Sequence, residues 1–364
     1  MTNPEPASHA RFLMAGGGTG GHVIPALAVA RELRRRGHGV FFVGTARGLE
    51  AKLVPAEGFE LKEIAIGGLN RVSAGQKLAT LARLPFVTLA SMRYREAAVF
   101  SMGGYVAGPP VMAALVKRVP VVVMEPNAVP GFTNRAIGRL VARALVAFPE
   151  TGRYFAAGRS EVTGLPVREE FFALAPKPRV ERLNVLITGG SQGSRTLNRA
   201  GRESWPLFRA AGFPIRIVHQ CGAAAAEEMR EAFAASGLEG EVTPFIADMP
   251  AAFAAADLVV CRSGAGAVSE LAAAGRPSIL VPFPFAADDH QARNAEAIER
   301  GGAARLVRDA EMNGERLYTL VRELAAAEGA LERMGAAARQ FAHPGAARRA
   351  AEILEEVAGV RRAS

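Results

Sequence analysis

Near its start the chain reads Gly16-Gly17-Gly18-Thr19-Gly20-Gly21-His22, and 173 positions later it reads Gly189-Gly190-Ser191-Gln192-Gly193-Ser194. Each glycine-rich turn follows a short apolar run typical of a strand and precedes a run typical of a helix. Such a turn exposes backbone N–H groups at the positive end of a helix dipole, which favours phosphate binding. Two such turns predict two similar α/β halves with a charged ligand in the crevice between them.

Length and composition are those of a globular protein with two domains. A chain of 364 residues exceeds one ordinary core, and its contents of 49% hydrophobic and 22% charged residues exclude a disordered protein. Cys221 and Cys261, both in apolar surroundings, cannot build a disulfide framework, which favours a reducing cytoplasm. The first ten residues lack a basic segment and an apolar segment, so no secretion signal is expected.

Positive charge is concentrated in the first half. Residues 1–160 contain 20 Lys and Arg against 9 Glu and no Asp, a net charge of +11, and the remainder carries a net charge of −2. An anionic partner is therefore expected for the first half: nucleic acid, a lipid surface or a phosphorylated substrate.

The order of elements predicts a doubly wound α/β fold. Continuous apolar runs, in which apolar and polar residues do not alternate, are typical of parallel strands buried on both faces. In this chain such runs are separated by segments with the residue spacing of helices, which indicates a doubly wound sheet in each half. The uncharged stretch 97–116 is long enough to span a membrane, but its glycines and prolines favour a strand, a loop and a helix. The domain boundary is expected near 163–166, and the chain is helical from 315 onward, with a break at Pro344. Strands are expected at 11–15, 40–43, 98–102, 120–124, 144–147, 183–188, 216–219, 257–261, 278–281 and 304–307.

The first turn also matches the dinucleotide fingerprint G-x-G-x-x-G through Gly16, Gly18 and Gly21. A nicotinamide site needs an acidic residue at the end of the second strand, yet no acid occurs there before Glu50. A P-loop needs Lys after the last glycine, where this chain has His22. Both nucleotide-binding classes are therefore disfavoured.

Three further groups of side chains are candidates for chemistry. His22, at the rim of the first turn, is suited to accept a hydroxyl proton or, when charged, to hold a phosphate. Glu270 lies near the start of a helix that, like those after the two glycine turns, begins with small residues. Its position fits equally well a surface carboxylate that interacts favourably with the helix dipole and a carboxylate that accepts hydrogen bonds from ribose hydroxyls. Gln291 and Asn294 share one helical face and suit sugar hydroxyls, while Asp288 or Asp289 is expected to cap that helix.

Seven motifs, in order along nearly the whole chain, resemble the MurG family of peptidoglycan glycosyltransferases. That family adds N-acetylglucosamine (GlcNAc) from UDP-GlcNAc to lipid I, undecaprenyl-diphosphoryl-N-acetylmuramoyl-pentapeptide, and forms lipid II. The motifs are Gly17-Gly18-Thr19-Gly20-Gly21-His22, Met102-Gly103-Gly104-Tyr105, Glu125-Pro126-Asn127, Gly164-Leu165-Pro166-Val167-Arg168, Gly189-Gly190-Ser191-Gln192-Gly193, Cys261-Arg262-Ser263-Gly264-Ala265 and Gln291-Ala292-Arg293-Asn294.

The resemblance implies the GT-B fold, in which two Rossmann-like domains face a central cleft. Residues 1–163 would form the acceptor domain and residues 164–342 the UDP-GlcNAc domain, while residues 343–364 would form a helix that returns to the first domain. The implied reaction inverts the anomeric carbon and uses neither a metal nor a cofactor. The chain also lacks an Asp-x-Asp motif, so helix dipoles and backbone donors must neutralise the leaving group.

The resemblance also implies roles for individual residues. His22 would be the catalytic base or a ligand of the acceptor diphosphate. Acceptor and diphosphate contacts would come from Gly18, Gly103, Gly104 and Tyr105. UDP-GlcNAc contacts would come from Thr19, Gly20, Gly21, Asn127, Arg168, Ser191, Ile246, Ala265, Gly266, Ala267, Val268, Ser269, Glu270, Gln291 and Asn294.

A lipid-linked acceptor also accounts for the positive charge of the first half. Between positions 69 and 118 there are seven basic residues and one acidic residue, interleaved with apolar ones. Such a segment suits an anionic membrane surface, so we expect peripheral binding to the cytoplasmic face of the cell membrane. The residues expected to contact the membrane are Lys77, Leu78, Leu81, Arg83 and Phe86.

Two other functions remain open from the residues. A UDP-GlcNAc 2-epimerase would use the same fold and nucleotide sugar but would leave the basic apolar segment unexplained. A nucleic-acid-binding protein would use the basic half, yet the aromatic content is 7% and no known nucleic-acid motif occurs. Nucleic acid is therefore not expected as a partner.

Overall fold

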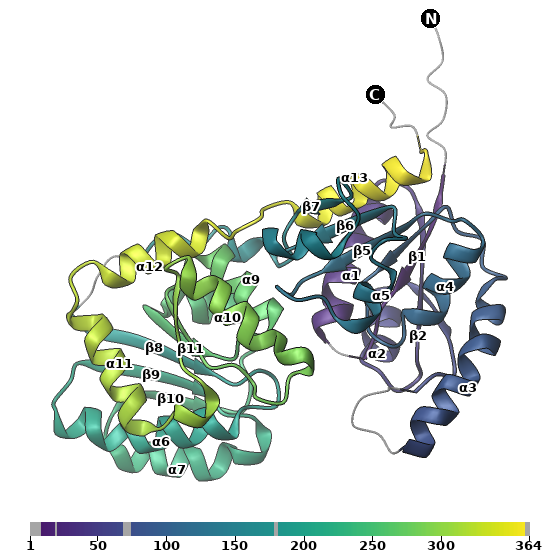
Figure 1. The fold of residues 1–364 in the computed structure, drawn as a ribbon. Coiled ribbons are helices and arrows are strands. Elements are labelled where there is room, and N and C mark those ends of the chain that lie inside the picture. Colours follow the sequence, from purple (N-terminus) through teal and green to yellow (C-terminus); the bar gives the residue numbers. More distant parts are fainter. Residues whose placement is uncertain (1–8, 19, 68–73, 178–180, 361–364) are drawn as a thin grey trace, which may run out of the picture. The chain divides into compact units, whose positions relative to one another are not determined.

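The structure is a computed structural model that describes residues 9–18, 20–67, 74–177 and 181–360. The chain forms two compact units (Figure 1). The first unit comprises residues 1–166 and 345–364, and the second comprises residues 167–344.

The first unit is built on a parallel sheet in the order β3-β2-β1-β4-β5-β6-β7. Its central strands are continuous apolar runs; in β4 and β5, for example, every residue is buried. The strands are β1 (Arg11–Ala15), β2 (Gly39–Gly44), β3 (Glu60–Glu63), β4 (Ala98–Ser101), β5 (Val121–Glu125), β6 (Arg143–Val146) and β7 (Ser160–Val162). The helices are α1 (Gly20–Arg35), α2 (Glu50–Ala56), α3 (Ala74–Ser91), α4 (Gly108–Val116), α5 (Phe132–Ile137) and α13 (Ala346–Ala358).

Helix α13 belongs to the first unit although it lies at the end of the chain. It packs against α1 and β4. In Figure 1 it is the yellow helix labelled α13. The carboxylate of Glu355 on α13 contacts Arg36 at 2.8 Å and His38 at 3.0 Å. The last helix is thereby joined to the segment between α1 and β2.

The second unit repeats this topology with a parallel sheet in the order β10-β9-β8-β11-β12-β13. Helices α6 and α7 lie on one face of the sheet, and α9, α10 and α12 lie on the other (Figure 1). The strands are β8 (Leu183–Thr188), β9 (Ile215–Gln220), β10 (Glu239–Thr243), β11 (Leu258–Cys261), β12 (Ser278–Leu280) and β13 (Ala304–Leu306). The helices are α6 (Arg195–Ala210), α7 (Ala226–Ser236), α8 (Met249–Ala255), α9 (Ala265–Ala274), α10 (His290–Arg300), α11 (Gly314–Ala326) and α12 (Ala330–Arg339).

The two glycine turns occupy equivalent places in the two sheets. The first follows β1 and the second follows β8, and each of these strands lies where the strand order reverses. This switch point is where open α/β sheets bind ligands, beyond the carboxyl ends of the strands. The predicted fold of two doubly wound parallel sheets is confirmed.

The stretch 97–116 forms β4, a loop and α4, as expected. No helix among the described residues combines the length and the apolar character needed to cross a membrane.

Candidate active site

The first glycine turn brings its residues against the loop that follows β4. Gly18 has φ +86°, a conformation that side chains rarely adopt, and a Cβ placed there would lie 3.6 Å from the ring of Tyr105. A Cβ at Gly104 would lie 3.4 Å from the imidazole of His22. Gly103 follows Ser101, whose hydroxyl accepts its N–H at 3.1 Å. The residues expected near the acceptor therefore gather at one place, while Thr19 lies outside the described residues.

His22 is held in one orientation by the turn itself. It lies on the first turn of α1, and its Nδ1 is 3.2 Å from the carbonyl oxygen of Gly17. A carbonyl oxygen accepts hydrogen bonds only, so Nδ1 carries the proton, and Nε2 is the basic nitrogen of the neutral ring. Gly20 and Gly21 open α1, where N–H groups lack partners inside the helix.

A buried carboxylate organises the loop that contains Asn127. Glu125 is 2% exposed and accepts from the N–H of Asn127 at 3.0 Å, from its side-chain amide at 3.1 Å, and from Gly131 and Asn134. Burial raises the pKa of Glu125, although these hydrogen bonds oppose the rise. Sequence reasoning quoted this residue within a motif but gave it no role.

A second buried carboxylate, Glu50, received no role from the sequence. It begins α2, is 0% exposed, and accepts the N–H of Gly18 at 2.7 Å. In the sequence it stands out only as the first acid after the second strand, and its partner lies 32 residues away. The N–H of Gly18 is therefore bonded within the first unit, and the expected contact of Gly18 with the acceptor diphosphate stays a prediction.

The second glycine turn opens α6. Gly193 has φ +74°, and its N–H donates to Gly190 at 2.8 Å. Ser194 caps the helix by accepting from the N–H of Leu197. Ser191, at the tip of the turn, is exposed.

A third turn, after β11, opens α9 with small residues. Gly264 is the N-cap residue, and the first turn of α9 holds no acidic side chain that would repel an anion. The N–H of Val268 donates to Gly264 at 3.0 Å, and the Val268 side chain is buried in the core. The N–H groups at the start of α9 that lack a helical partner include those of Ala265, Gly266 and Ala267, so these can donate to a phosphate. The expected phosphate contacts over 265–269 stay a prediction.

Glu270 and Arg168 both belong to the second unit and interact electrostatically. Burial raises the pKa of Glu270 to about 7, and the nearby guanidinium of Arg168 partly opposes this rise. Glu270 is half-buried on α9, and Arg168 is exposed, with its guanidinium 5.1 Å from the ring centre of Phe171. A carboxyl group with this pKa changes charge near neutral pH.

Gln291 and Asn294 share one face of α10, as predicted, but their situations differ. Asn294 is 0% exposed and donates to the carbonyl of Ser263 at 3.2 Å. Gln291 is half-buried; its side-chain carbonyl accepts from Phe283 at 3.0 Å, and its backbone carbonyl accepts from the hydroxyl of Ser263 at 2.8 Å. Asn294 thus supports the turn before α9, and the expected contacts of these two side chains with sugar hydroxyls stay a prediction.

Two smaller expectations concern loops at the same edge of the second sheet. Asp289 is the N-cap residue of α10, but its side chain makes no capping hydrogen bond, since it has φ +53°. Ile246 is half-buried in the loop between β10 and α8. Ser191, Ile246, Ala265 and Gln291 thus all follow carboxyl ends of strands in one sheet.

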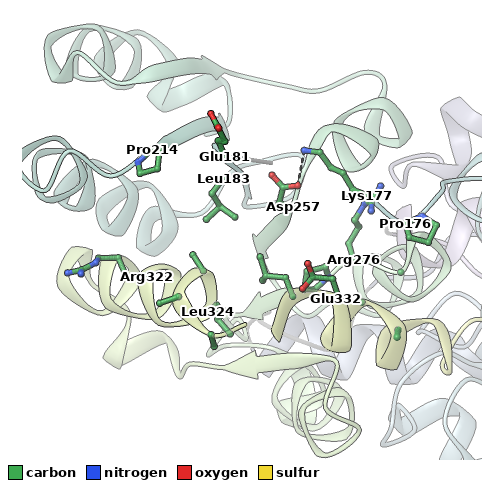
Figure 2. Close-up of a pocket in the computed structure, with 18 of the residues that line it drawn as sticks. Pro176, Lys177, Glu181, Leu183, Pro214, Asp257, Arg276, Arg322, Leu324 and Glu332 are labelled. Atoms are coloured by element: carbon green, nitrogen blue, oxygen red, sulfur yellow. Dashed lines mark ion pairs between the residues drawn. The ribbon is translucent and has the colours of Figure 1, made fainter. Parts of the chain in front are cut away.

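A cavity of about 510 Å³ lies at the opposite edge of that sheet. Figure 2 shows Leu183 and Leu324 pointing into it and the ion pair of Lys177 with Asp257 at its border, at 2.8 Å. Leu183 begins β8 and Asp257 precedes β11, so the amino ends of the strands line it. It contains none of the residues expected to bind the donor.

Within the described ranges, no group of three His, Cys, Asp or Glu residues has the arrangement that holds a metal ion.

Comparisons with known proteins agree along the chain. The glycosyltransferase family 28 N-terminal domain matches residues 12–146, and the family 28 C-terminal domain matches residues 184–350. The UDP-N-acetylglucosamine--N-acetylmuramyl-(pentapeptide) pyrophosphoryl-undecaprenol N-acetylglucosamine transferase of Solibacter usitatus is 74% identical over 362 residues, which cover 98% of this chain and 99% of that protein.

Solved structures give the same result. The crystal structure of MurG from Acinetobacter baumannii has a TM-score of 0.80 at 35% identity, and the match covers 95% of this chain and 99% of that one. A putative UDP-N-acetylglucosamine 2-epimerase from Listeria monocytogenes has a TM-score of 0.70 at 13% identity, covering 98% and 99% of the two chains. At that identity the epimerase shares the fold alone.

Proposed function

The chain belongs to glycosyltransferase family 28, and we propose that it transfers GlcNAc from UDP-GlcNAc to lipid I, forming lipid II and UDP in peptidoglycan synthesis. The observation that carries this proposal is 74% identity, over nearly the whole of both chains, to a transferase named for that reaction. The enzyme is an N-acetylglucosaminyltransferase. An epimerase function has no comparable support, because the epimerase likeness is 13% identical.

The second unit is proposed to bind the donor. The N–H groups of Ala265, Gly266 and Ala267 meet the diphosphate at the positive end of α9. Glu270 accepts the ribose hydroxyls, and Gln291 offers its amide to the sugar. The remaining proposed nucleotide contacts are Ser191, in the loop after β8, and Ile246, in the loop after β10, at the same edge of the sheet. Arg168 interacts with Glu270 and partly opposes the rise in the pKa of that carboxyl group, which favours its charged form.

The first unit is proposed to bind the acceptor and supply the base. Nε2 of His22 takes the proton of the acceptor hydroxyl as its oxygen bonds the anomeric carbon and the bond from that carbon to the diphosphate breaks. The electron pair leaves with UDP, whose charge the α9 amides stabilise. Gly103, Gly104 and Tyr105, in the loop beside this histidine, are the proposed acceptor contacts. Gly20, Gly21 and Asn127 are the proposed UDP-GlcNAc contacts of this unit.

Peripheral attachment to the cytoplasmic face of the cell membrane is proposed from an apolar surface on α3 and α4. These helices pack together and expose Phe86 (75%), Leu89 (67%) and Val116 (63%). Arg83 is exposed beside them, so the surface combines apolar and basic groups. The other expected membrane residues, Lys77, Leu78 and Leu81, lie on α3, but their side chains are outside the described part of the structure.

The test of the proposed function is release of UDP from UDP-GlcNAc, with and without a lipid I analogue, in the presence of chelator. The expected result is release that depends on the acceptor and persists in chelator. Formation of the mannosamine epimer from UDP-GlcNAc alone, or release that requires added metal, would contradict the proposal.

A further inference from the structure

The carboxylate of Glu50 accepts hydrogen bonds from two other segments of the first unit. Its Oε2 accepts the N–H of Gly18 at 2.7 Å, and its Oε1 accepts the N–H and the hydroxyl of Thr45, both at 2.9 Å. The carboxylate therefore joins the end of β2 to the first glycine turn. Burial alone would raise the pKa of Glu50, but these donors outweigh it and the pKa is lowered, so the group is ionised at neutral pH.

The space around this carboxylate is shaped by glycines. A Cβ added at Gly17, Gly44 or Gly48 would collide with the side chain of Glu50. The three glycines come from the turn, from the end of β2 and from the segment before α2. A carboxylate fits here only because all three positions lack a side chain, which indicates a fixed position for its two oxygens.

One peptide group connects Glu50 to His22. The peptide between Gly17 and Gly18 donates its N–H to Glu50, and its carbonyl oxygen accepts from Nδ1 of His22 at 3.2 Å. An anion bonded to the N–H end of a peptide strengthens the carbonyl at the other end as an acceptor, because hydrogen bonds in a chain polarise one another. A stronger acceptor at Nδ1–H fixes the tautomer and the ring orientation and makes Nε2 more basic.

We propose that Glu50 is a positioning residue for catalysis: through the Gly17–Gly18 peptide it orients His22 with Nδ1 protonated and Nε2 directed at the acceptor hydroxyl. The proposal rests on the role of His22 as the base in the proposed function. Glu50 itself is fully buried, so we place it outside the residues that contact substrate. Its effect is therefore on turnover and not on donor binding.

The first test is kinetic. Glu50→Gln is expected to lower kcat by about 10- to 100-fold, the loss typical of removing an outer residue that orients a functional histidine. The KM for UDP-GlcNAc is expected to stay unchanged. In a double-mutant cycle, adding Glu50→Gln to His22→Ala is expected to cause little further loss, because the partner through which it acts is already absent. Glu57→Gln is the matched control, since Glu57 follows α2 and pairs with Arg31 at the surface.

Independent losses from Glu50→Gln and His22→Ala, multiplying in the double variant, would overturn the proposal. If His22→Ala alone keeps full turnover, the proposed role of His22 fails instead, and the two failures are thereby distinguished.

The second test does not depend on activity, and its measurement on the wild-type protein does not depend on the folding of Glu50→Gln. Selective ¹⁵N labelling of the six histidines, with His22→Gln to assign the signal, reports which ring nitrogen of His22 is protonated. The wild-type protein is expected to show Nδ1–H, and Glu50→Gln is expected to shift His22 toward the other tautomer. An Nε2–H tautomer in the wild type would overturn the proposal.

Discussion

Nε2 of His38 lies 3.0 Å from Oε1 of Glu355, and both side chains are almost fully buried. The second carboxylate oxygen of Glu355 contacts Arg36 at 2.8 Å. These bonds join the last helix, α13, to the segment that precedes β2, 317 residues earlier in the chain. Helix α13 is therefore a structural part of the first unit and not an appended tail.

Glu355→Ala is expected to destabilise the first unit by about 3 kcal/mol, since removing one partner leaves buried polar and charged groups uncompensated. Hydrogen exchange of amides in β1 and β2 measures the change in that unit. Glu356→Gln serves as the control, because Glu356 pairs with Arg349 at the surface, and a change within about 1 kcal/mol is expected there. Equal effects of the two substitutions would contradict this account of α13.

Binding of UDP-GlcNAc is expected to weaken as the pH falls below about 7, the pKa to which burial raises Glu270. Ribose hydroxyls donate to the charged carboxylate, so binding favours ionisation, and each pH unit below the pKa weakens binding by up to about tenfold. Calorimetric titration from pH 5.5 to 8 measures this dependence.

The raised pKa of Glu270 has the opposite consequence for the free protein. Because the folded-state pKa lies above the unfolded value, Glu270 contributes stability at low pH that is lost as the pH rises toward about 7.

Glu270→Gln is expected to remove the pH dependence of donor binding. An unchanged dependence in that variant would assign it to another group.

The interior of each sheet was predictable because strands buried on both faces are continuous apolar runs, as in β5 and β8. The strands β3, β7 and β10 were missed, and all three lie at sheet edges. Their sequences, ELKE, SEV and EGEVT, carry charged residues that an edge tolerates and an interior does not. An edge strand is fixed by its partner more than by its own composition.

The candidate site was predictable in location but not in the direction of its polar groups. Glycine turns and strand ends placed the binding residues at the carboxyl edges of the sheets. Whether the N–H of Gly18 faces a ligand depends on Glu50, which is distant in sequence. Likewise, helical spacing put Gln291 and Asn294 on one face, but only packing against Ser263 shows that Asn294 is buried.

Substitutions of Asn294 and Gln291 on α10 are expected to distinguish a residue that stabilises the fold from one that contacts UDP-GlcNAc. Asn294→Ala leaves the Ser263 carbonyl without its buried donor, so the free energy of unfolding is expected to fall by about 1–3 kcal/mol. Gln291→Ala is expected to raise the KM for UDP-GlcNAc with a smaller loss of stability, because Gln291 is half-buried. Urea unfolding followed by Trp205, which is buried in the same unit, measures the first effect, and steady-state kinetics measures the second. A stability loss for Gln291→Ala as large as that for Asn294→Ala would contradict the distinction.

Replacing Phe86 and Leu89 together by Ser is expected to weaken binding to anionic vesicles by at least about tenfold, since burial of one large apolar side chain contributes about 1.5–3 kcal/mol. Arg83→Glu is expected to weaken it further and to lower its sensitivity to salt, because a cation near an anionic surface contributes about 1 kcal/mol. Sedimentation with vesicles at two ionic strengths measures both effects. Phe285→Ser is the control, since Phe285 is 71% exposed on the second unit and outside the proposed membrane surface. If the Phe285 variant loses as much binding as the Phe86 and Leu89 variant, attachment is not specific to α3, and general surface hydrophobicity explains it instead.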